Sequence, residues 1–359
     1  MVDHAAFQPD WTVPPGAVLE EALEERGWSQ AELARRTDRP LKTINEIVRG
    51  KAAITPDTAI QFERAMGIPA RLWLNLERVH AESEARHASR QALSKNLEWL
   101  RRFPTADLQR RGKLPRTRDK VELMDALLRF LGTSSPEAWQ RQWDSVHVAL
   151  RRSQRYAPQP EALSVWLRWG ELEVPLGSPA FDSALLRSVI PTIRTLTTLD
   201  PIAFQQPLQE ALARAGVVLL LIPELSGTRI SGAARRLDGA RAAIQLSLRH
   251  KTDDQFWFAL FHECGHLLDG FRRRTYVDVV GQPTTDPDEV RADEFARDAL
   301  IDRVAYDTFV LERRFDAQAV KRFADEQHIA SGIVVGRLRR DRFIAPGALA
   351  FLRRSIDWG

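Results

Sequence analysis

In the first 90 residues, apolar positions recur every three to four residues, and prolines, glycines and short polar residues separate the apolar stretches. This spacing predicts amphipathic helices. Ser29 and Glu32 form a capping box at the start of one stretch, and Gly50 and Gly67 end two others. The last stretch is longer and turns polar, so we expect it to leave the first domain as a linker helix. The expected helices span residues 15–27, 29–37, 40–50, 55–67 and 70–90.

After residue 215 the pattern changes to short runs typical of strands. "GVVLLLIP" (216–223) is a continuous apolar run, and "RISGAARRL" and "ARAAIQLSL" meet at an Asp238-Gly239 pair, which is a strong hairpin signal. We expect one of these two strands to form the edge of the sheet. Helical spacing dominates before and after this region. The sequence therefore predicts an α+β chain in three parts: an all-helical domain over 1–90, a helical connector over 91–207, and a domain with a small twisted sheet over 208–359.

Composition narrows the class of protein. The 359 residues are 44% hydrophobic and 28% charged, which is ordinary for a globular protein, and no apolar run is long enough to cross a bilayer. The N-terminal residues lack the pattern of a secretory signal, and a single cysteine excludes an internal disulfide framework. We therefore expect a cytoplasmic protein without membrane contact. Residues 86–155 hold 16 Lys/Arg against 7 Asp/Glu, a charge that suits a polyanion but also suits a solvated surface.

Residues 29–50 have the spacing of a helix-turn-helix, with two short helices separated by "TDRP". The residues expected to point inward between them are Leu33, Ala34, Ile44 and Ile47. The outward residues offer the amide, hydroxyl and cationic groups that base edges and phosphates require. The candidate DNA contacts are Gln30, Lys42, Thr43, Asn45 and Arg49. Leu41 and Glu46 are poor partners for phosphate, which disfavours tight DNA binding. The alternative is a helical dimerisation domain that does not bind DNA.

This stretch resembles the Xre/Cro-type helix-turn-helix, and more closely the antitoxins of the HigA type. The resemblance covers about residues 13–90, with "SQAELARR", "INEIVRGK" and "ITPDTA" in the family order. We expect the domain to bind a palindromic double-stranded DNA operator as a homodimer, with half-sites about one helical turn apart.

The segment "FALFHECGHLLDG" (258–270) carries an HExxH pattern on an apolar helix. His262 and His266 are four residues apart, so both imidazoles lie on one helix face and can reach one zinc ion. Glu263 points to the adjacent face, where it can take a proton from the attacking water and pass it to a leaving amine. Cys264 lies on a different face and is expected to be a small buried residue. The alternative is a core helix with two buried histidines, which the apolar surroundings and the preceding hairpin make less favourable.

A catalytic zinc site needs a third protein ligand, with water as the fourth. In "DEVRADEFARDALI", Glu289 shares an inward stripe with small and apolar residues, where a carboxylate is costly unless it meets a buried cation. Glu289 is therefore the expected third ligand. Asp293 borders the stripe and is positioned to orient a histidine. The stripe consists of Glu289, Ala292, Ala296 and Leu300.

Residues 215–341 resemble the ImmA/IrrE family of zinc metallopeptidases. The matching segments are "GVVLLLIPELSGTRISGAARRL", "AIQLSLRHKTDDQFWFALFHECGHLLDG", "EVRADEFARDALI" and "HIASGIVVGRLRRD". The resemblance implies a gluzincin-like fold, endopeptidase activity, and repressors or antitoxins as substrates. It also places the family's third ligand, the Glu of an ExxAxxFA helix, at Glu289. This chain departs from the family where Arg291 replaces an acidic residue, which we expect to put a cation near the site.

Together these features predict a DNA-binding regulatory zinc endopeptidase that cleaves a repressor or antitoxin to control transcription. The alternative is a non-catalytic antitoxin or repressor whose zinc domain senses a ligand or binds a toxin. Tyr306 and His328 are candidate stabilisers of the oxyanion, with ordinary packing or a helix cap as the alternative role for each.

Overall fold

The computed structural model describes residues 12–143, 159–175, 177, 179–228, 230–238, 240–247, 249, 251–270, 278–279 and 286–356. The chain forms two compact units: residues 1–97 with 119–121, and residues 98–118 with 122–359. Most of the segment expected to be a separate connector thus falls within the same unit as the sheet. Among the described residues, no helix combines the length and the apolar character that crossing a bilayer requires.

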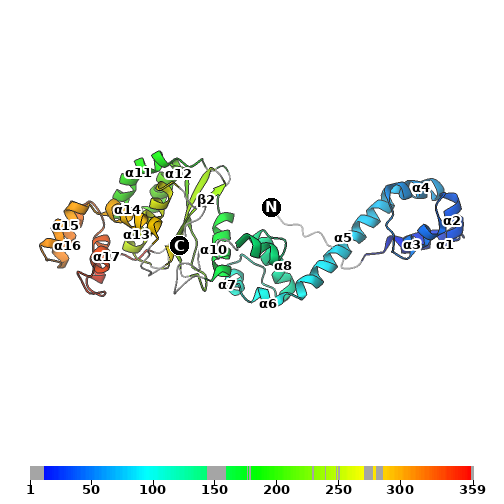
Figure 1. The fold of residues 1–359 in the computed structure, drawn as a ribbon, viewed down its shortest axis with the longest axis horizontal. Helices are drawn as coiled ribbons and strands as arrows, with labels where there is room; N and C mark the ends of the chain where they lie inside the picture. Colours follow the sequence, from blue (N-terminus) through cyan, green and yellow to red (C-terminus); the bar gives the residue numbers. More distant parts are fainter. Residues whose placement is uncertain are drawn as a thin grey trace. The chain divides into compact units, whose positions relative to one another are not determined.

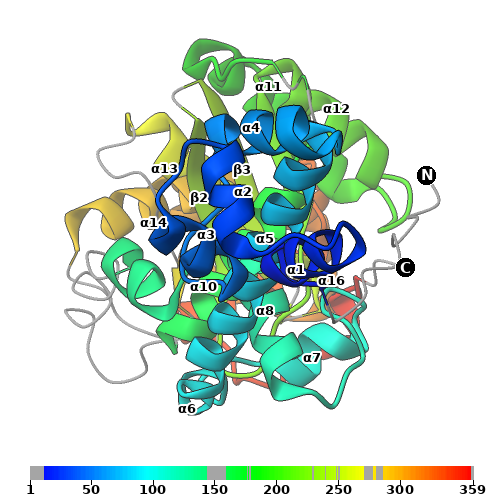
Figure 2. The same ribbon diagram turned by 90° about the vertical axis from the view of Figure 1, so that its right-hand side faces the viewer.

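The first unit is all-helical, as predicted. Its helices are α1 (Pro15–Glu25), α2 (Gln30–Arg36), α3 (Leu41–Val48), α4 (Pro56–Met66) and α5 (Ala70–Ser94). The side chain of Ser29 accepts a hydrogen bond from the backbone N–H of Glu32, and Gly67 ends α4 in the left-handed conformation. In Figure 2, α1–α4 gather around the start of α5.

The core of this unit lies between the short helices and the first turn of α5. The residues expected to point inward from α2 and α3 are all buried there. Phe62 of α4 and Trp73 of α5 are also fully buried, and their rings meet edge to face at 5.6 Å. This packing fixes the angle between α2 and α3, which in turn sets the exposed surface of α3.

The helices before the sheet in the second unit are α6 (Leu97–Leu100), α7 (Thr105–Arg110), α8 (Lys120–Leu131), α10 (Pro160–Leu172), α11 (Ser183–Thr195), η1 (Leu196–Thr198) and α12 (Gln205–Arg214). Hydrogen bonds tie α10 to the strands. Trp166 donates its indole N–H to the carbonyl of Ile222, and Gln245 donates to the carbonyl of Trp166. The buried guanidinium of Arg235 donates to the carbonyl of Leu167. Helix α10 is therefore part of the sheet domain.

The sheet has the order β1-β3-β2-β4, with β1 at Val217–Leu221, β2 at Ile230–Asp238, β3 at Arg241–Leu246 and β4 at Asp278–Val279. Strands β2 and β3 are antiparallel, which confirms the predicted hairpin; Gly239 lies outside the described residues. Strand β1 pairs with β3 in parallel. The predicted sheet edge was wrong: β3 is central, and β2 pairs on its other side with β4 at Ile230 and Gly232, so neither hairpin strand ends the sheet.

Helices follow the hairpin: α13 (Asp253–Leu268), α14 (Pro287–Leu300), α15 (Arg303–Leu311), α16 (Ala317–Glu326), α17 (Ser331–Arg340) and the short η2 (Ala350–Leu352). Helix α13 is central, since it packs against β2, β3, α14 and α17 (Figure 1). Its N-terminal turn is held by ion pairs from Asp253 to Arg354 and from Asp254 to Arg353. These contacts place the HExxH segment in the middle of a mixed helical domain with a small sheet.

Candidate metal centre and DNA-binding surface

Helix α13 is buried on nearly all sides, which explains its apolar sequence. Leu260, Phe261, Cys264 and Leu267 are fully buried. Cys264 is therefore a core residue, as expected, and burial raises the pKa of its thiol. His262 and His266 are buried on another face of the same helix. Because water does not reach this helix, its buried histidines need hydrogen-bond partners or metal contacts within the chain.

Helix α14 brings the predicted third ligand to these histidines. Nε2 of His266 lies 3.0 Å from Nε2 of His262, and Oε2 of Glu289 lies 3.2 Å from His262 and 3.5 Å from His266. Ligands at about 2.0–2.1 Å from a tetrahedral zinc ion lie about 3.3–3.4 Å from one another. The three atoms therefore fit the base of a tetrahedral site without rearrangement, and the donor set of two imidazoles and one carboxylate suits zinc.

The packing of α14 on α13 follows from the small residues of its stripe. Ala292 and Ala296 are buried, and a Cβ atom placed on Gly265 would lie only 3.0 Å from Cα of Ala292. The expected inward stripe is thus confirmed. Burial favours the neutral carboxyl of Glu289, but the hydrogen bonds and charges of His262 and His266 outweigh it and hold its pKa at about 2.

Asp293 lies one turn after Glu289 and contacts the far side of His262. Its Oδ1 atom is 3.0 Å from Nδ1 of His262. Because a carboxylate only accepts, Nδ1–H is the donor, so a metal bound at the cluster would meet the lone pair of Nε2. Burial raises the pKa of Asp293, but the hydrogen bond from His262 and the charge of Arg340 outweigh it, so the net shift is downward.

Glu263 is fully buried on the face of α13 that meets the sheet. A Cβ atom placed on Gly232 of β2 would lie 2.5 Å from its Oε1 atom, so the carboxylate faces the backbone of this strand. The same strand residue pairs with Asp278 of β4. The carboxylate of Glu263 therefore lies against the part of β2 that pairs with β4.

Arg291 does not leave an unpaired cation beside the cluster. Its guanidinium donates to Asp269 at 2.7 Å and also forms an ion pair with Asp288. Two carboxylates thus offset its charge. The cation expected near the site is therefore already engaged by carboxylates of the chain.

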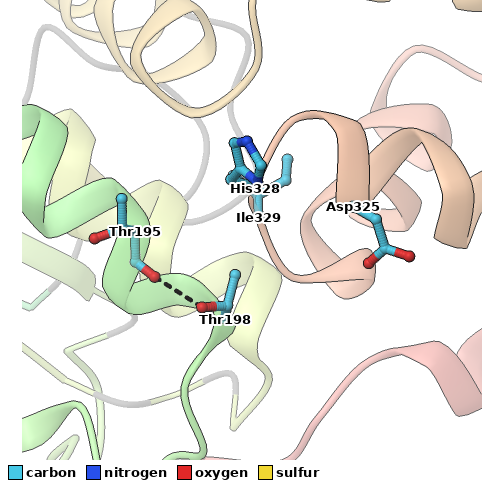
Figure 3. Close-up of a pocket in the computed structure, with 5 residues that line it drawn as sticks. All are labelled: Thr195, Thr198, Asp325, His328 and Ile329. Atoms are coloured by element: carbon cyan, nitrogen blue, oxygen red, sulfur yellow. Dashed lines mark hydrogen bonds between the residues drawn. The ribbon is translucent and has the colours of Figure 1, made fainter.

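The two oxyanion candidates have other surroundings. The phenol of Tyr306 is 2.9 Å from Oδ2 of Asp341 and donates to it, and the Arg337 guanidinium lies over its ring. Burial and this neighbouring carboxylate raise the pKa of Tyr306. His328 is exposed and lines a pocket with Thr195, Thr198, Asp325 and Ile329 (Figure 3). The contacts of Tyr306 with Asp341 and Arg337, and the pocket that His328 lines, do not include the residues of the cluster.

The helix-turn-helix presents its candidate residues at α2 and α3. Lys42 is exposed, with 84% of its side chain accessible, and it forms an ion pair with Glu46 at 3.8 Å. Asn45 donates to Gln30 at 3.2 Å, which joins the middle of α3 to the start of α2. Arg49 is exposed just after α3, and Thr43 is half-buried. Three of the five candidates thus lie on α3, Arg49 follows its last residue, and Gln30 is the first residue of α2.

Two features of the metal-centre region were missed by the sequence reasoning. Arg340 of α17 forms an ion pair with Asp293, and β4 pairs with β2 beside Glu263. Arg340 is one of several arginines in "RLRRD", and only its helix phase relative to Gly332 and Gly336 could have distinguished it.

The first unit is similar to a helix-turn-helix family and to an HTH-type transcriptional regulator. Residues 19–73 match the family model described as helix-turn-helix. The chain is 35% identical over 71 residues to the uncharacterized HTH-type transcriptional regulator YddM of Escherichia coli (strain K12), covering 20% of this chain and 76% of that protein. It is 41% identical over 66 residues to virulence-associated protein I of Dichelobacter nodosus, covering 18% of this chain and 61% of that protein.

Among solved structures, Pseudomonas aeruginosa antitoxin HigA with the higBA promoter is 34% identical, over 22% of this chain and 86% of that chain, with a TM-score of 0.21. The family match confirms the helix-turn-helix expected over residues 29–50, and the residues of the metal cluster lie outside the matched range. Through its N-terminal unit, the chain belongs to the helix-turn-helix family of transcriptional regulators.

Proposed function

We propose that this helix-turn-helix regulator is also a zinc endopeptidase, which cleaves a repressor or antitoxin to control transcription. The observation that supports this most strongly is the placement of His262, His266 and Glu289 at the mutual distances of zinc ligands, with Glu263 buried on the same helix. A purely structural zinc site gains nothing from a carboxylate at this position, whereas hydrolysis requires one.

Bound zinc would supply Lewis-acid activation of a water molecule and of the scissile carbonyl. The chain's own residues do the rest. His262 and His266 are locked by burial, and Asp293 fixes the orientation of the His262 ring. Glu263 accepts a proton from the attacking water and passes it to the leaving amine. The buried surroundings of α13 keep these groups in place before a substrate arrives.

The sheet offers a place for an extended peptide. Strand β2 passes Glu263 at Gly232, and a substrate segment aligned with β2 would bring its scissile carbonyl close to this carboxylate. Because β4 occupies the outer side of β2 at Ile230 and Gly232, the substrate would have to bind beyond this pairing or replace it.

The test is a cleavage assay with the full-length, zinc-loaded protein and candidate repressors and antitoxins from the same genome. We expect one partner to be cut at a discrete position, and a chelator to stop the reaction. Fragment masses identify the cut. If zinc-loaded protein binds such a partner and leaves it intact, the non-catalytic regulator becomes the better account.

The DNA-binding part of the proposal makes a separate prediction. Replacing Lys42 and Asn45 together by alanine should weaken operator binding by about 1–3 kcal/mol for each lost base contact. Binding is measured by fluorescence anisotropy at fixed salt. Arg71→Ala, an exposed position on α5, is the control for the change in net charge. Equal affinities for the double variant and the control would assign binding to another surface, with the basic segment 86–155 as the next candidate.

A further inference from the structure

Helix α17 approaches α13 closely along one face. Gly332, Gly336 and Arg340 are spaced by four residues, so they lie on the same side of this helix. A Cβ atom at Gly332 would lie 2.3 Å from a carboxylate oxygen of Asp253, and one at Gly336 would lie 2.6 Å from Asp254. The two glycines therefore allow a contact that larger residues would prevent, and this contact delivers Arg340 to the middle of α13.

Arg340 touches two of the neighbours of His262, Phe258 and Asp293. Its guanidinium carbon lies 4.5 Å from the ring centroid of Phe258, which is one turn before His262 on α13. Its Nη2 atom is 2.5 Å from Oδ2 of Asp293. The other oxygen of Asp293, Oδ1, is the one that accepts from His262. The arginine and the histidine thus use different oxygens and do not compete.

This division has a physical consequence for the imidazole. A carboxylate with one hydrogen bond can rotate and exchange its two oxygens, whereas one held at both oxygens cannot. A charge-assisted bond to Arg340 also favours the ionised carboxylate, which is the stronger acceptor for Nδ1–H. The side chain of Asp293 is 21% exposed, so without Arg340 water would compete for its oxygens.

We propose that Arg340 is a positioning residue for the zinc centre, acting through Asp293 to hold His262 in its ligating orientation. The inference rests on the proposed function, because it requires zinc at His262. The proposal gives α17 a second role. Besides packing in the core, this helix supports the ligand His262 through Arg340 and Asp293. Arg340 itself is not one of the three proposed ligands.

The experiment measures zinc affinity of the full-length protein by competition with a chromophoric chelator. Arg340→Ala should bind zinc about tenfold more weakly, since partners that support a ligand contribute about 10–100-fold. Arg340→Lys keeps the charge but loses the planar fork, and should recover part of the affinity. Arg322→Ala, an exposed arginine on α16, should match wild type. The melting temperatures of the metal-free proteins separate a loss of folding from a loss of positioning.

The decisive comparison measures the effect of Arg340→Ala in a protein that already carries Asp293→Ala. If Arg340 acts through Asp293, adding Arg340→Ala to Asp293→Ala should change zinc affinity by less than about twofold. Wild-type affinity in Arg340→Ala, or a full tenfold loss also in the Asp293→Ala background, would overturn the inference and leave the proposed function standing. A wild-type protein that binds no zinc would overturn both.

Discussion

Glu263→Gln is expected to slow cleavage of the protein partner by about 10²–10⁴-fold, while zinc and operator DNA remain bound. Glutamine keeps the shape of the buried side chain beside Gly232 but cannot accept a proton from water. Glu263 is not one of the three proposed ligands, and the helix-turn-helix belongs to the other unit of the chain. The effect should therefore appear in the rate of the chemical step and not in the affinity for metal or DNA.

The measurement follows appearance of the fragments under single-turnover conditions, with zinc content determined on the same sample. Glu294→Gln is the matched control, because it makes the same chemical change at an exposed position on α14. Cleavage by Glu263→Gln at the rate of this control would remove Glu263 from the mechanism, and with it the case for HExxH chemistry.

His266→Ala is expected to lose zinc and activity together. The side chain is almost fully buried, and its Nε2 atom is 3.0 Å from Nε2 of His262, so alanine leaves only two of the three proposed ligands. We expect zinc affinity to fall by more than about 100-fold, beyond the effect of a supporting partner. The stabilisation that zinc gives the wild-type protein should disappear as well.

Thermal melting with and without zinc, together with metal analysis after gel filtration, measures both effects. The control is His87→Ala, an exposed histidine on α5. Retention of zinc by His266→Ala at the wild-type affinity would show that the ion binds elsewhere in the chain.

Local patterns predicted the helix-turn-helix and the metal cluster for the same reason. Helical periodicity places residues four apart on one face, so His262 with His266, and Glu289 with Asp293, could be paired from spacing alone. Caps such as Ser29 act within three residues, so the ends of α2 were also predictable. Glu289 lies 27 residues from His262, so its choice as third ligand needed a further argument, the cost of a carboxylate on an apolar stripe without a buried partner.

Features that depend on distant neighbours were not predictable. Gln245 bonds to Trp166, 79 residues away, and this contact joins α10 to the sheet. Arg340 reaches Asp293 across 47 residues. Arg291 carries a charge in sequence, and only the fold reveals that Asp269, 22 residues earlier, offsets it. Tyr306 was proposed from its chemistry, and its observed partner, Asp341, lies 35 residues further on.

The most direct test of the zinc centre is the metal content of the full-length protein after loading with zinc and gel filtration. The account predicts about one zinc ion per chain, and close to none in a variant with His262, His266 and Glu289 all replaced by alanine. No zinc in the wild-type protein, or equal zinc in the triple variant, would contradict it.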